Sequence, residues 1–385
     1  MNRLKILILL DYYLPGFNGG GPLRSIKNLV DQLGDDFDFR IITSDRDLGS
    51  DLPYDEIQAD TWINFEGVNV YYISPGNLSI SGWSKIISNT EHDILYLNSF
   101  FQPRFTFLPL MARRLGKLPS KPTIVAPRGE LLEGCLKIKS LKKTIYLFLA
   151  KSIGLYKNLN WQASSKFEVV SFKDVMGSVA SRIQIATNLP PIPQEINIEN
   201  PRISGTPLKV CFISRLTQEK NLEYALQVLK KVEVPVVFDI YGPKQDEEYW
   251  KMCEALILEQ KEPVSVSYCG ELEHKFINET FLKYDLFFFP SKGENFGHVI
   301  IEAMLMGTPV LLSDTTPWRS LREKGVGWDL SLDDPLSFVK AINDAYNATP
   351  EEYKVFRESV RQYAIEVSLD KEAIKASKLL FLDAS

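Results

Sequence analysis

The sequence predicts an α/β fold built from two Rossmann-like, doubly wound domains that face a central cleft. Its 385 residues are too many for one ordinary core and suit two domains. Apolar runs of strand length alternate with helical patterns, which is typical of doubly wound parallel sheets. The alternation stops in the proline-dense segment 187–207 and then starts again. We therefore expect one domain over residues 1–190, a second over 205–365, and a C-terminal helix near 366–385 that packs back on the first.

Apolar runs bounded by glycine, proline or polar residues are expected to form the strands. In the first domain these runs are 6–10, 39–43, 68–73, 93–98 and 123–126, with helical patterns at 24–33 and 105–115. In the second domain they are 208–214, 236–241, 264–270, 285–289 and 309–313, with helical patterns at 222–231 and 298–307. Open α/β sheets bind ligands beyond the carboxyl ends of their strands, so the polar residues that follow strands are the candidate site residues.

The composition, with 45% hydrophobic and 24% charged residues, is that of an ordinary globular protein. The net charge of −5 is unevenly spread along the chain. Residues 104–166 hold thirteen Lys or Arg against two acids, whereas residues 205–365 hold eighteen against twenty-five. One half therefore carries a basic patch and the other half is acidic.

Cysteine usage and the N-terminal residues predict a cytoplasmic protein. Cys211 and Cys269 stand in apolar strand-like runs, so we expect buried reduced thiols, which suit a reducing compartment. The apolar run at residues 4–10 ends at Asp11 and lacks a small-residue cleavage site, so we expect a first strand there and not a signal peptide. No stretch reaches the ~18 apolar residues that a membrane span needs.

The most informative segment is 290–309, in which Glu294 and Glu302 stand eight positions apart. Glu294 falls in a loop after an apolar strand, and Glu302 falls inside the helix that begins near His298. Gly297 relaxes the backbone at the turn between them. Helix N-terminal N–H groups favour phosphate, and carboxylates accept hydrogen bonds from vicinal sugar hydroxyls. The segment therefore indicates a ligand that combines phosphate with a sugar, as in a nucleotide sugar.

Three further candidates follow strands. Glycines 19–21 after the first strand let a ligand approach the backbone closely, and the alternative is a flexible loop. Arg215 and Lys220 can converge on one diphosphate, and the alternative is a pair of surface cations. Arg128 follows the fifth strand of the first domain, and the alternative there is a charged turn.

The segment 136–159 has an apolar helical face surrounded by lysines and contains no acid. A basic amphipathic helix of this kind can lie on an anionic membrane surface. An ordinary core helix with a solvated lysine face explains the same pattern, and both interpretations stay open.

Several familiar motifs are absent or discounted. Asp45-Arg46-Asp47 has the form of a metal-diphosphate motif, but its place after a strand of a Rossmann-like domain favours a polar loop. The three histidines are far apart in sequence, so we expect no zinc site. The sequence contains no Walker A motif, no GxSxG motif and no nucleic-acid signature.

Taken together, segments 19–24, 214–221 and 294–303 resemble family 4 of the retaining glycosyltransferases, which have the GT-B fold. The resemblance covers nearly the whole chain. Segments 126–129 and 313–318 are similar to the subgroup found in bacterial capsule, exopolysaccharide and lipopolysaccharide gene clusters.

The resemblance implies a role for each matching position. Arg215 and Lys220 would hold the donor diphosphate and stabilise the leaving nucleotide. Glu302 would bind the ribose hydroxyls and Glu294 the transferred sugar. Further donor-binding residues would be Gly20, Gly21, Arg24, Leu272, Asn295, Phe296, Gly297, His298 and Val299. The family normally needs no metal, so neither a metal nor another cofactor is expected.

Arg128 departs from the family pattern, because many members carry a histidine there, beside the transferred sugar. An arginine cannot act as a base near neutral pH. The departure suits a front-side displacement in which the leaving phosphate accepts the acceptor proton, and it leaves open whether Arg128 contacts phosphate, sugar or an acidic acceptor.

The resemblance thus predicts a metal-independent, retaining transfer of a hexose-type sugar from a nucleoside-diphosphate sugar, UDP favoured over GDP. The expected acceptor is a saccharide, lipid-linked and reached at the inner face of the cell membrane through 136–159. Two rivals remain: a GT-B sugar-nucleotide epimerase, which the shortage of histidines disfavours, and a non-catalytic two-domain sugar-binding protein.

Overall fold

The computed structural model describes residues 3–132, 140–179, 181–198 and 202–385. The chain divides into two compact units, one formed by Met1–Pro191 with Asp370–Ser385 and the other by Ile192–Leu369. The second unit therefore starts earlier than residue 205. Arg202 accounts for part of this difference, because its buried side chain hydrogen-bonds Asp285 and the Tyr346 carbonyl inside the second unit.

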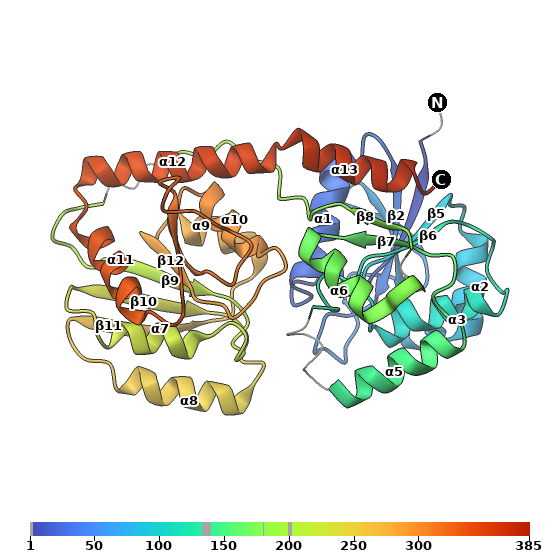
Figure 1. Cartoon of the computed structure of the whole chain (residues 1–385), viewed down its shortest axis with the longest axis horizontal. Helices are drawn as coiled ribbons and strands as arrows, with labels where there is room; N and C mark the ends of the chain where they lie inside the picture. The colour runs from blue at the N-terminus through green and yellow to red at the C-terminus, as the bar shows by residue number, and fades with distance from the viewer. Residues whose placement is uncertain (1–2, 133–139, 180, 199–201) are drawn as a thin grey trace. The chain divides into compact units, whose positions relative to one another are not determined.

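The first unit contains a mainly parallel sheet with strand order β3-β4-β2-β1-β5-β6-β7-β8, in which only the β3–β4 pair of the described residues is antiparallel (Figure 1). Its strands are β1 (Lys5–Leu9), β2 (Asp38–Ser44), β3 (Trp62–Phe65), β4 (Val68–Ile73), β5 (Ile94–Leu97), β6 (Thr123–Val125), β7 (Asn160–Ala163) and β8 (Ile183–Ile185). Its helices are α1 (Gly21–Leu33), α2 (Ile80–Asn89), α3 (Leu108–Arg114), α5 (Ser140–Ser152), α6 (Lys166–Met176) and α13 (Lys371–Leu382), with short turns η1 (Pro75–Asn77), η2 (Pro103–Phe107) and η3 (Gly177–Val179).

Both faces of this sheet are buried. Along β1, Ile6 and Ile8 pack into one apolar cluster, whereas Leu7 and Leu9 pack into the other. This is the alternation that a strand imposes on successive side chains, and it explains why buried parallel strands read as continuous apolar runs. The α13 helix joins the first cluster through Leu380 and Phe381.

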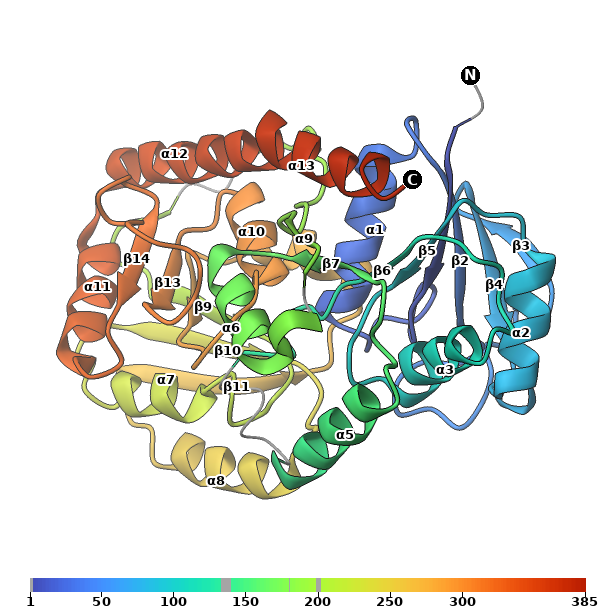
Figure 2. The same cartoon turned by 45° about the vertical axis from the view of Figure 1, so that its right-hand side comes forward.

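The second unit contains a parallel sheet with strand order β11-β10-β9-β12-β13-β14. Its strands are β9 (Leu208–Ile213), β10 (Val236–Tyr241), β11 (Val264–Gly270), β12 (Leu286–Phe289), β13 (Val310–Ser313) and β14 (Gly327–Leu330). Its helices are α7 (Leu222–Leu229), α8 (Glu247–Leu258), α9 (Ile277–Phe281), α10 (His298–Leu305), α11 (Pro335–Asn347) and α12 (Pro350–Ser368), with the turn η4 (His274–Phe276). Figure 2 shows helices on both faces of this sheet.

The predicted α/β class and the two parallel sheets are confirmed. One detail was wrong: Cys269 is exposed, because β11 is the edge strand and its side chains alternate between the interior and solvent. Cys211 on the central strand β9 is buried as expected, and burial raises the pKa of its thiol. Cys135 lies outside the described residues.

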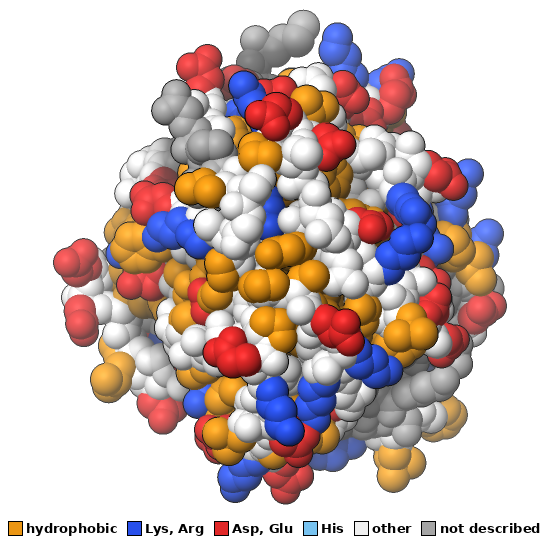
Figure 3. Space-filling view, turned by 90° about the vertical axis from the view of Figure 1, so that its left-hand side faces the viewer, with side chains coloured by type: hydrophobic (Ala, Val, Ile, Leu, Met, Phe, Trp, Pro, Cys, Tyr) orange, Lys and Arg blue, Asp and Glu red, His pale blue; other side chains and the backbone are white. Residues whose placement is uncertain are grey.

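On the face that Figure 3 shows, acidic and basic side chains are interspersed and apolar side chains gather only in small groups. Among the described residues no helix is both long enough and apolar enough to cross a bilayer.

Candidate functional site

The chain of the second unit reverses its direction of winding at the junction of β9 and β12. From β9 the strands run outward through β10 to β11, and the chain then returns to place β12 on the other side of β9. Ligands of open α/β sheets bind at such a switch point, beyond the carboxyl ends of the strands. The loop that carries Arg215 and Lys220 follows β9, and the loop that carries Glu294 follows β12.

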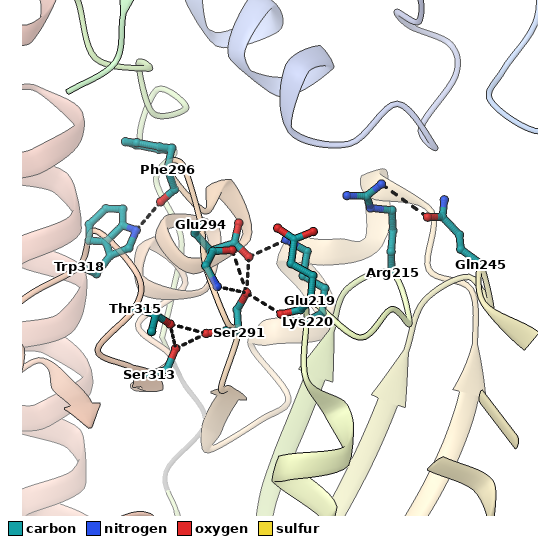
Figure 4. Close-up of polar contacts among 11 residues, drawn as sticks. Arg215, Glu219, Lys220, Gln245, Ser291, Glu294, Phe296, Ser313, Thr315 and Trp318 are labelled. Carbon is teal, nitrogen blue, oxygen red and sulfur yellow. Dashed lines mark hydrogen bonds and ion pairs between the residues drawn. The ribbon is translucent and has the colours of Figure 1, made fainter. Parts of the chain in front are cut away.

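Lys220 and Glu294 meet at this point. The Lys220 Nζ lies 2.6 Å from Glu294 Oε1, and the two side chains are only 11% and 12% exposed. Ser291 donates its hydroxyl to the same carboxylate oxygen at 3.0 Å. Figure 4 shows this cluster beyond the strand ends, with the charged groups of Lys220 and Glu294 directed toward each other. The sequence predicted both residues and their neighbourhood, but not this ion pair.

The loop after β12 is tied down on both sides. Ser313 is the last residue of β13 and Thr315 lies two residues later, and both donate their hydroxyls to the Ser291 carbonyl (Figure 4). On the other side, the Asn221 amide donates to the Pro290 carbonyl at 3.0 Å and the Lys292 N–H donates to the Glu219 carbonyl at 2.8 Å. Glu294 is therefore presented by a loop whose backbone is held from two neighbouring strands.

Arg215 lies apart from this ion pair. Its side chain is exposed, and its nearest described polar partner is Gln245, at 3.5 Å from the guanidinium. Beyond Gln245, the Lys244 Nζ sits 4.0 Å from the ring centroid of Trp250 and 4.3 Å from that of Tyr268. Arg215 and Lys244 thus place one cation after β9 and another after β10, and cations of this kind can bind an anion.

Helix α10 starts as the sequence predicted. Gly297 has φ of 78° and caps the helix, and a Cβ there would meet Ile300 Cδ1 at 2.7 Å. A side chain at this position would be strained by both the backbone and the contact. His298 follows as the first helical residue, Val299 is half-buried and Ile300 is fully buried.

Glu302 projects from α10 and is only 7% exposed. Its Oε1 lies 3.2 Å from His274 Nε2, and His274 begins the turn η4 after β11. Leu272, predicted to lie beside the base, is in the same β11–η4 connection and packs half-buried against the core. The contact with His274 thus places Glu302 next to the β11–η4 connection, which also carries Leu272.

Phe296 is fixed by Trp318, whose indole N–H donates to the Phe296 carbonyl at 2.6 Å (Figure 4). The ring of Phe296 also packs against His298 and Trp318, with centroids 4.8 and 5.6 Å apart. Asn295 stands between Glu294 and this aromatic cluster and is half-buried. The whole stretch 294–298 is therefore held in a defined conformation.

In the first unit, the glycine-rich loop joins β1 to α1. Gly20 has φ of 64° and precedes the helix, and neither Gly20 nor Gly21 has any atom within 4 Å of an added Cβ. Asp47 accepts hydrogen bonds from the N–H groups of Phe17 and Asn18 at 2.9 and 3.1 Å. The Asp45-Arg46-Asp47 segment is thus a polar loop, as expected, and its second aspartate anchors the glycine loop. Arg24 lies in the first turn of α1 and is half-buried.

Arg128 follows β6 with φ of 54°. Its guanidinium donates to the side-chain oxygens of Asn98, Asn188 and Tyr96, the first at 2.7 Å and the last at 2.6 Å. All three of these partners are neutral groups, and together they hold the guanidinium in one orientation.

Two carboxyl groups lie near the same sheet edge. Burial raises the pKa of the Glu130 carboxyl. The hydrogen bonds that it accepts from the Phe101 and Phe100 N–H groups and the Ser99 hydroxyl lower this pKa, but by less. Burial likewise raises the pKa of Asp11, which accepts a hydrogen bond from Gln102.

The structure thus gathers the second-unit candidates, predicted separately along the sequence, at one sheet edge, and it places Gly20, Gly21, Arg24 and Arg128 in the first unit. Sequence reasoning did not single out His274, and it gave no role to Ser291 or Trp318 although both lie in segments that it selected. These three residues contact Glu302, Glu294 and Phe296. Within the described ranges, no group of three or more His, Cys, Asp or Glu side chains is placed to hold a metal ion.

Residues 193–363 match the family model described as Glycosyl transferases group 1. This part of the chain is therefore similar to the group 1 glycosyltransferase domains. The matched range contains all the second-unit candidates, from Arg215 to Glu302.

Known proteins resemble most or all of this chain at low sequence identity. An uncharacterized 41.2 kDa protein in the cps region of Klebsiella pneumoniae is 22% identical over 287 residues, which cover 73% of this chain and 76% of that protein. The solved structure of Anabaena HepE in complex with UDP and glucose has a TM-score of 0.70 at 18% identity and covers 100% of both chains. The apo lipopolysaccharide outer core galactosyltransferase WaaB has a TM-score of 0.60 at 15% identity and covers 99% of this chain and 100% of that one. The likeness to these two structures shows that the chain has the predicted GT-B fold.

Proposed function

We propose that this chain is a retaining glycosyltransferase of family 4 that moves a hexose-type sugar from a UDP-sugar to a saccharide acceptor in bacterial surface polysaccharide synthesis. The observation that carries the proposal is the Lys220–Glu294 pair at the sheet switch point of a group 1 glycosyltransferase domain. The relative from a cps region and the likeness to a lipopolysaccharide galactosyltransferase support the pathway class. The solved complex of HepE with UDP and glucose supports UDP over GDP.

The donor diphosphate binds along Arg215 and Lys220. An ammonium group carries three N–H donors, so Lys220 can keep Glu294 and still reach a phosphate oxygen. Arg215 is exposed at the adjacent strand end and presents a planar fork of donors to the same diphosphate. As the sugar–phosphate bond breaks, these cations stabilise the charge that develops on the leaving nucleotide.

Glu302 binds the ribose and Glu294 binds the transferred sugar. A carboxylate accepts hydrogen bonds from vicinal hydroxyls, and both carboxylates are nearly buried, Glu294 in the loop before α10 and Glu302 within that helix. The backbone of 295–298 and the side chain of Val299 line the donor, and Leu272 lies at the base.

Transfer proceeds on one face of the sugar. The bond from the anomeric carbon to the diphosphate breaks, the bond to the acceptor oxygen forms on the same side, and the acceptor proton passes to the departing phosphate oxygen. Arg128 cannot serve as a base in this step. It contacts an anionic or sugar group through the guanidinium that Asn98, Asn188 and Tyr96 hold in place.

Labelled UDP- and GDP-sugars incubated with a membrane extract test the proposal. Label in a lipid or saccharide product supports it, an isomerised donor indicates an epimerase, and absence of turnover with retained ligand binding indicates a sugar-binding protein. Lys220→Ala and Glu302→Ala should abolish transfer while the thermal unfolding temperature without ligand stays close to that of the wild type. Lys292→Ala is the matched control, because Lys292 lies on the same loop as Glu294 but is 48% exposed and pairs with Glu223.

Metal independence is part of the proposal, since Arg215 and Lys220 supply the positive charge that a diphosphate needs. Transfer should continue at an unchanged rate in excess EDTA. A rate that collapses in EDTA and returns with Mg²⁺ or Mn²⁺ would contradict it.

A further inference from the structure

Helix α5 of the first unit exposes a row of large apolar side chains. Leu141, Ile145, Phe148, Leu149 and Ile153 are 72, 51, 69, 55 and 42% exposed. Their spacing places them on one side of a helix. We call these five residues the α5 face. In Figures 1 and 2 the helix runs along the outer side of the first unit.

The opposite side of α5 already has its core contacts. Ala150 is buried, and Tyr146 and Leu147 pack against the same apolar cluster. The ring of Tyr146 contacts Phe101 and Phe107, with centroids 5.6 and 5.8 Å away. The helix is therefore anchored by one side, and the α5 face is a second apolar surface that the fold itself does not use.

Cations surround the α5 face. The sequence holds no acid between residues 140 and 160, and Lys142, Lys151 and Lys157 are exposed. Two arginines at the end of α3 are fixed beside the C-terminal end of the helix: Arg114 donates to the Ile153 carbonyl at 2.8 Å, and Arg113 donates to the carbonyls of Lys157 and Asn158 at 3.0 Å each. Segment 103–122, which supplies them, also contains no acid.

We propose that the α5 face docks on an anionic lipid bilayer. Five large apolar groups at the level of the headgroups, with lysine and arginine around them, are the combination that holds a helix flat in a membrane interface. This inference rests on the proposed function in one respect: it gives the acceptor of that transfer a place, as a lipid-linked saccharide reached from the membrane surface.

A second copy of the chain is a poorer occupant. A two-fold interface through the α5 face would set the same five cations of each copy against those of the other. Like charges held close together disfavour such a contact. Anionic headgroups neutralise the cations and leave the apolar row to the hydrocarbon boundary.

Residues 136–139 of the predicted amphipathic segment lie outside the described residues. The sequence left two interpretations of it open, and α5 combines them, because one side of the helix is a core surface and the other is apolar, basic and exposed.

Co-sedimentation of the full chain with vesicles tests the inference. The wild type should bind vesicles of phosphatidylglycerol and phosphatidylcholine about tenfold or more tightly than pure phosphatidylcholine vesicles, and added salt should weaken the binding. Ile145→Ser with Phe148→Ser should reduce binding about tenfold or more. The variant with both Lys142→Gln and Lys151→Gln should bind the anionic vesicles about tenfold or more weakly, and its binding to neutral vesicles should not change.

Leu336→Ser is the matched control, because Leu336 is 66% exposed on α11 of the other unit, and its vesicle binding should equal that of the wild type. Equal binding of the wild type to neutral and anionic vesicles would overturn the inference. Two other results would also overturn it. One is vesicle binding that is unchanged in the Ile145→Ser, Phe148→Ser variant, and the other is a wild-type dimer that becomes a monomer in this variant.

Nucleotide-sugar binding separates this inference from the proposed function. The α5 variants should keep the thermal stabilisation by UDP and the transfer to a soluble acceptor. A wild type that binds anionic vesicles but no nucleotide sugar would refute the proposed function and leave the docking surface standing.

Discussion

Glu302 is held by a side chain that no motif in the sequence indicates. His274 Nε2 lies 3.2 Å from its Oε1, and the histidine itself is half-buried. The imidazole fixes one carboxylate oxygen and so limits the rotation of the Glu302 side chain. If Glu302 binds a ribose, His274 is a positioning residue for that contact.

Replacing His274 with Ala should raise the KM for the donor by roughly 2- to 10-fold, the equivalent of one hydrogen bond, and leave kcat near its wild-type value. Initial-rate kinetics with a UDP-sugar measure both constants. Lys275→Ala is the control, since Lys275 is next in the chain, 67% exposed and paired with Glu273. An unchanged KM in His274→Ala would mean that the histidine does not position Glu302.

Trp318 should matter through one hydrogen bond. Trp318→Phe keeps an aromatic ring near Phe296 but loses the N–H that donates to the Phe296 carbonyl at 2.6 Å. We expect a loss of about 1 kcal/mol in the free energy of unfolding and a lower kcat/KM, because the 294–298 loop loses a tether. Urea denaturation and initial rates test this, with Trp62→Phe, in the first unit and 38% exposed, as the comparison.

Single residues were predictable where a motif carries them. Lys220 and Glu294 could be named because each follows a strand at a recognisable spacing. The roles of Ser291 and Trp318 could not be predicted, although both lie in selected segments, because these roles come from contacts to atoms that only the folded loop brings near. Cys269 was misjudged although the run 264–270 alternates apolar and polar residues, because its register with Ser265 and Ser267, which are also exposed, was overlooked.

At the scale of elements, the site depends on how closely strand ends approach one another. Gly242 follows β10 with φ of 140°, and a Cβ there would lie 1.8 Å from the Ser214 carbonyl oxygen at the end of β9. The turn that leads to Arg215 therefore leaves no room for a side chain at Gly242.

Gly242→Ala should displace this turn and destabilise the second unit by more than about 2 kcal/mol, a size typical of backbone strain combined with a clash. Gly293→Ala should be nearly neutral, since an added Cβ there meets nothing within 4 Å. Thermal unfolding of the two variants provides the comparison, and similar unfolding temperatures would show that the β9–β10 turn can adapt.

Most strands were predicted within a residue or two because buried parallel strands are continuous apolar runs. The strands β3, β7, β8 and β14 were not predicted. Each has only three or four residues, and the side chains of the antiparallel β3 are partly or largely exposed. For α5 the pattern of apolar and basic residues was visible, but only the packing of Tyr146 decides which side is the core side.

On the scale of the whole molecule, α13 is separated in sequence from the unit that it completes. Phe381 is fully buried, and its ring centroid lies 5.2 Å from that of Phe37, 5.9 Å from Phe39 and 5.7 Å from Tyr96. The first core is therefore closed by a helix that follows the entire second unit.

Phe381→Ala should lower the free energy of unfolding of the first unit by about 3–5 kcal/mol, the usual result of emptying a buried aromatic site. Leu382→Ala should change it by less than about 0.5 kcal/mol, because Leu382 is 50% exposed. Denaturant unfolding followed by tryptophan fluorescence measures both. A small effect of Phe381→Ala would mean that α13 is dispensable for the first core.

This placement of α13 sets the order in which the chain can mature during synthesis. Residues 1–191 emerge first from the ribosome, yet the aromatic cluster of Phe37, Phe39 and Tyr96 stays uncovered until α13 has been made. The contiguous segment 192–369 meets no such delay and can complete its own core beforehand. We therefore expect the second unit to complete its core before the first, the reverse of the usual N-terminal-first order, and the nascent first unit to stay open to chaperones and proteases for longer.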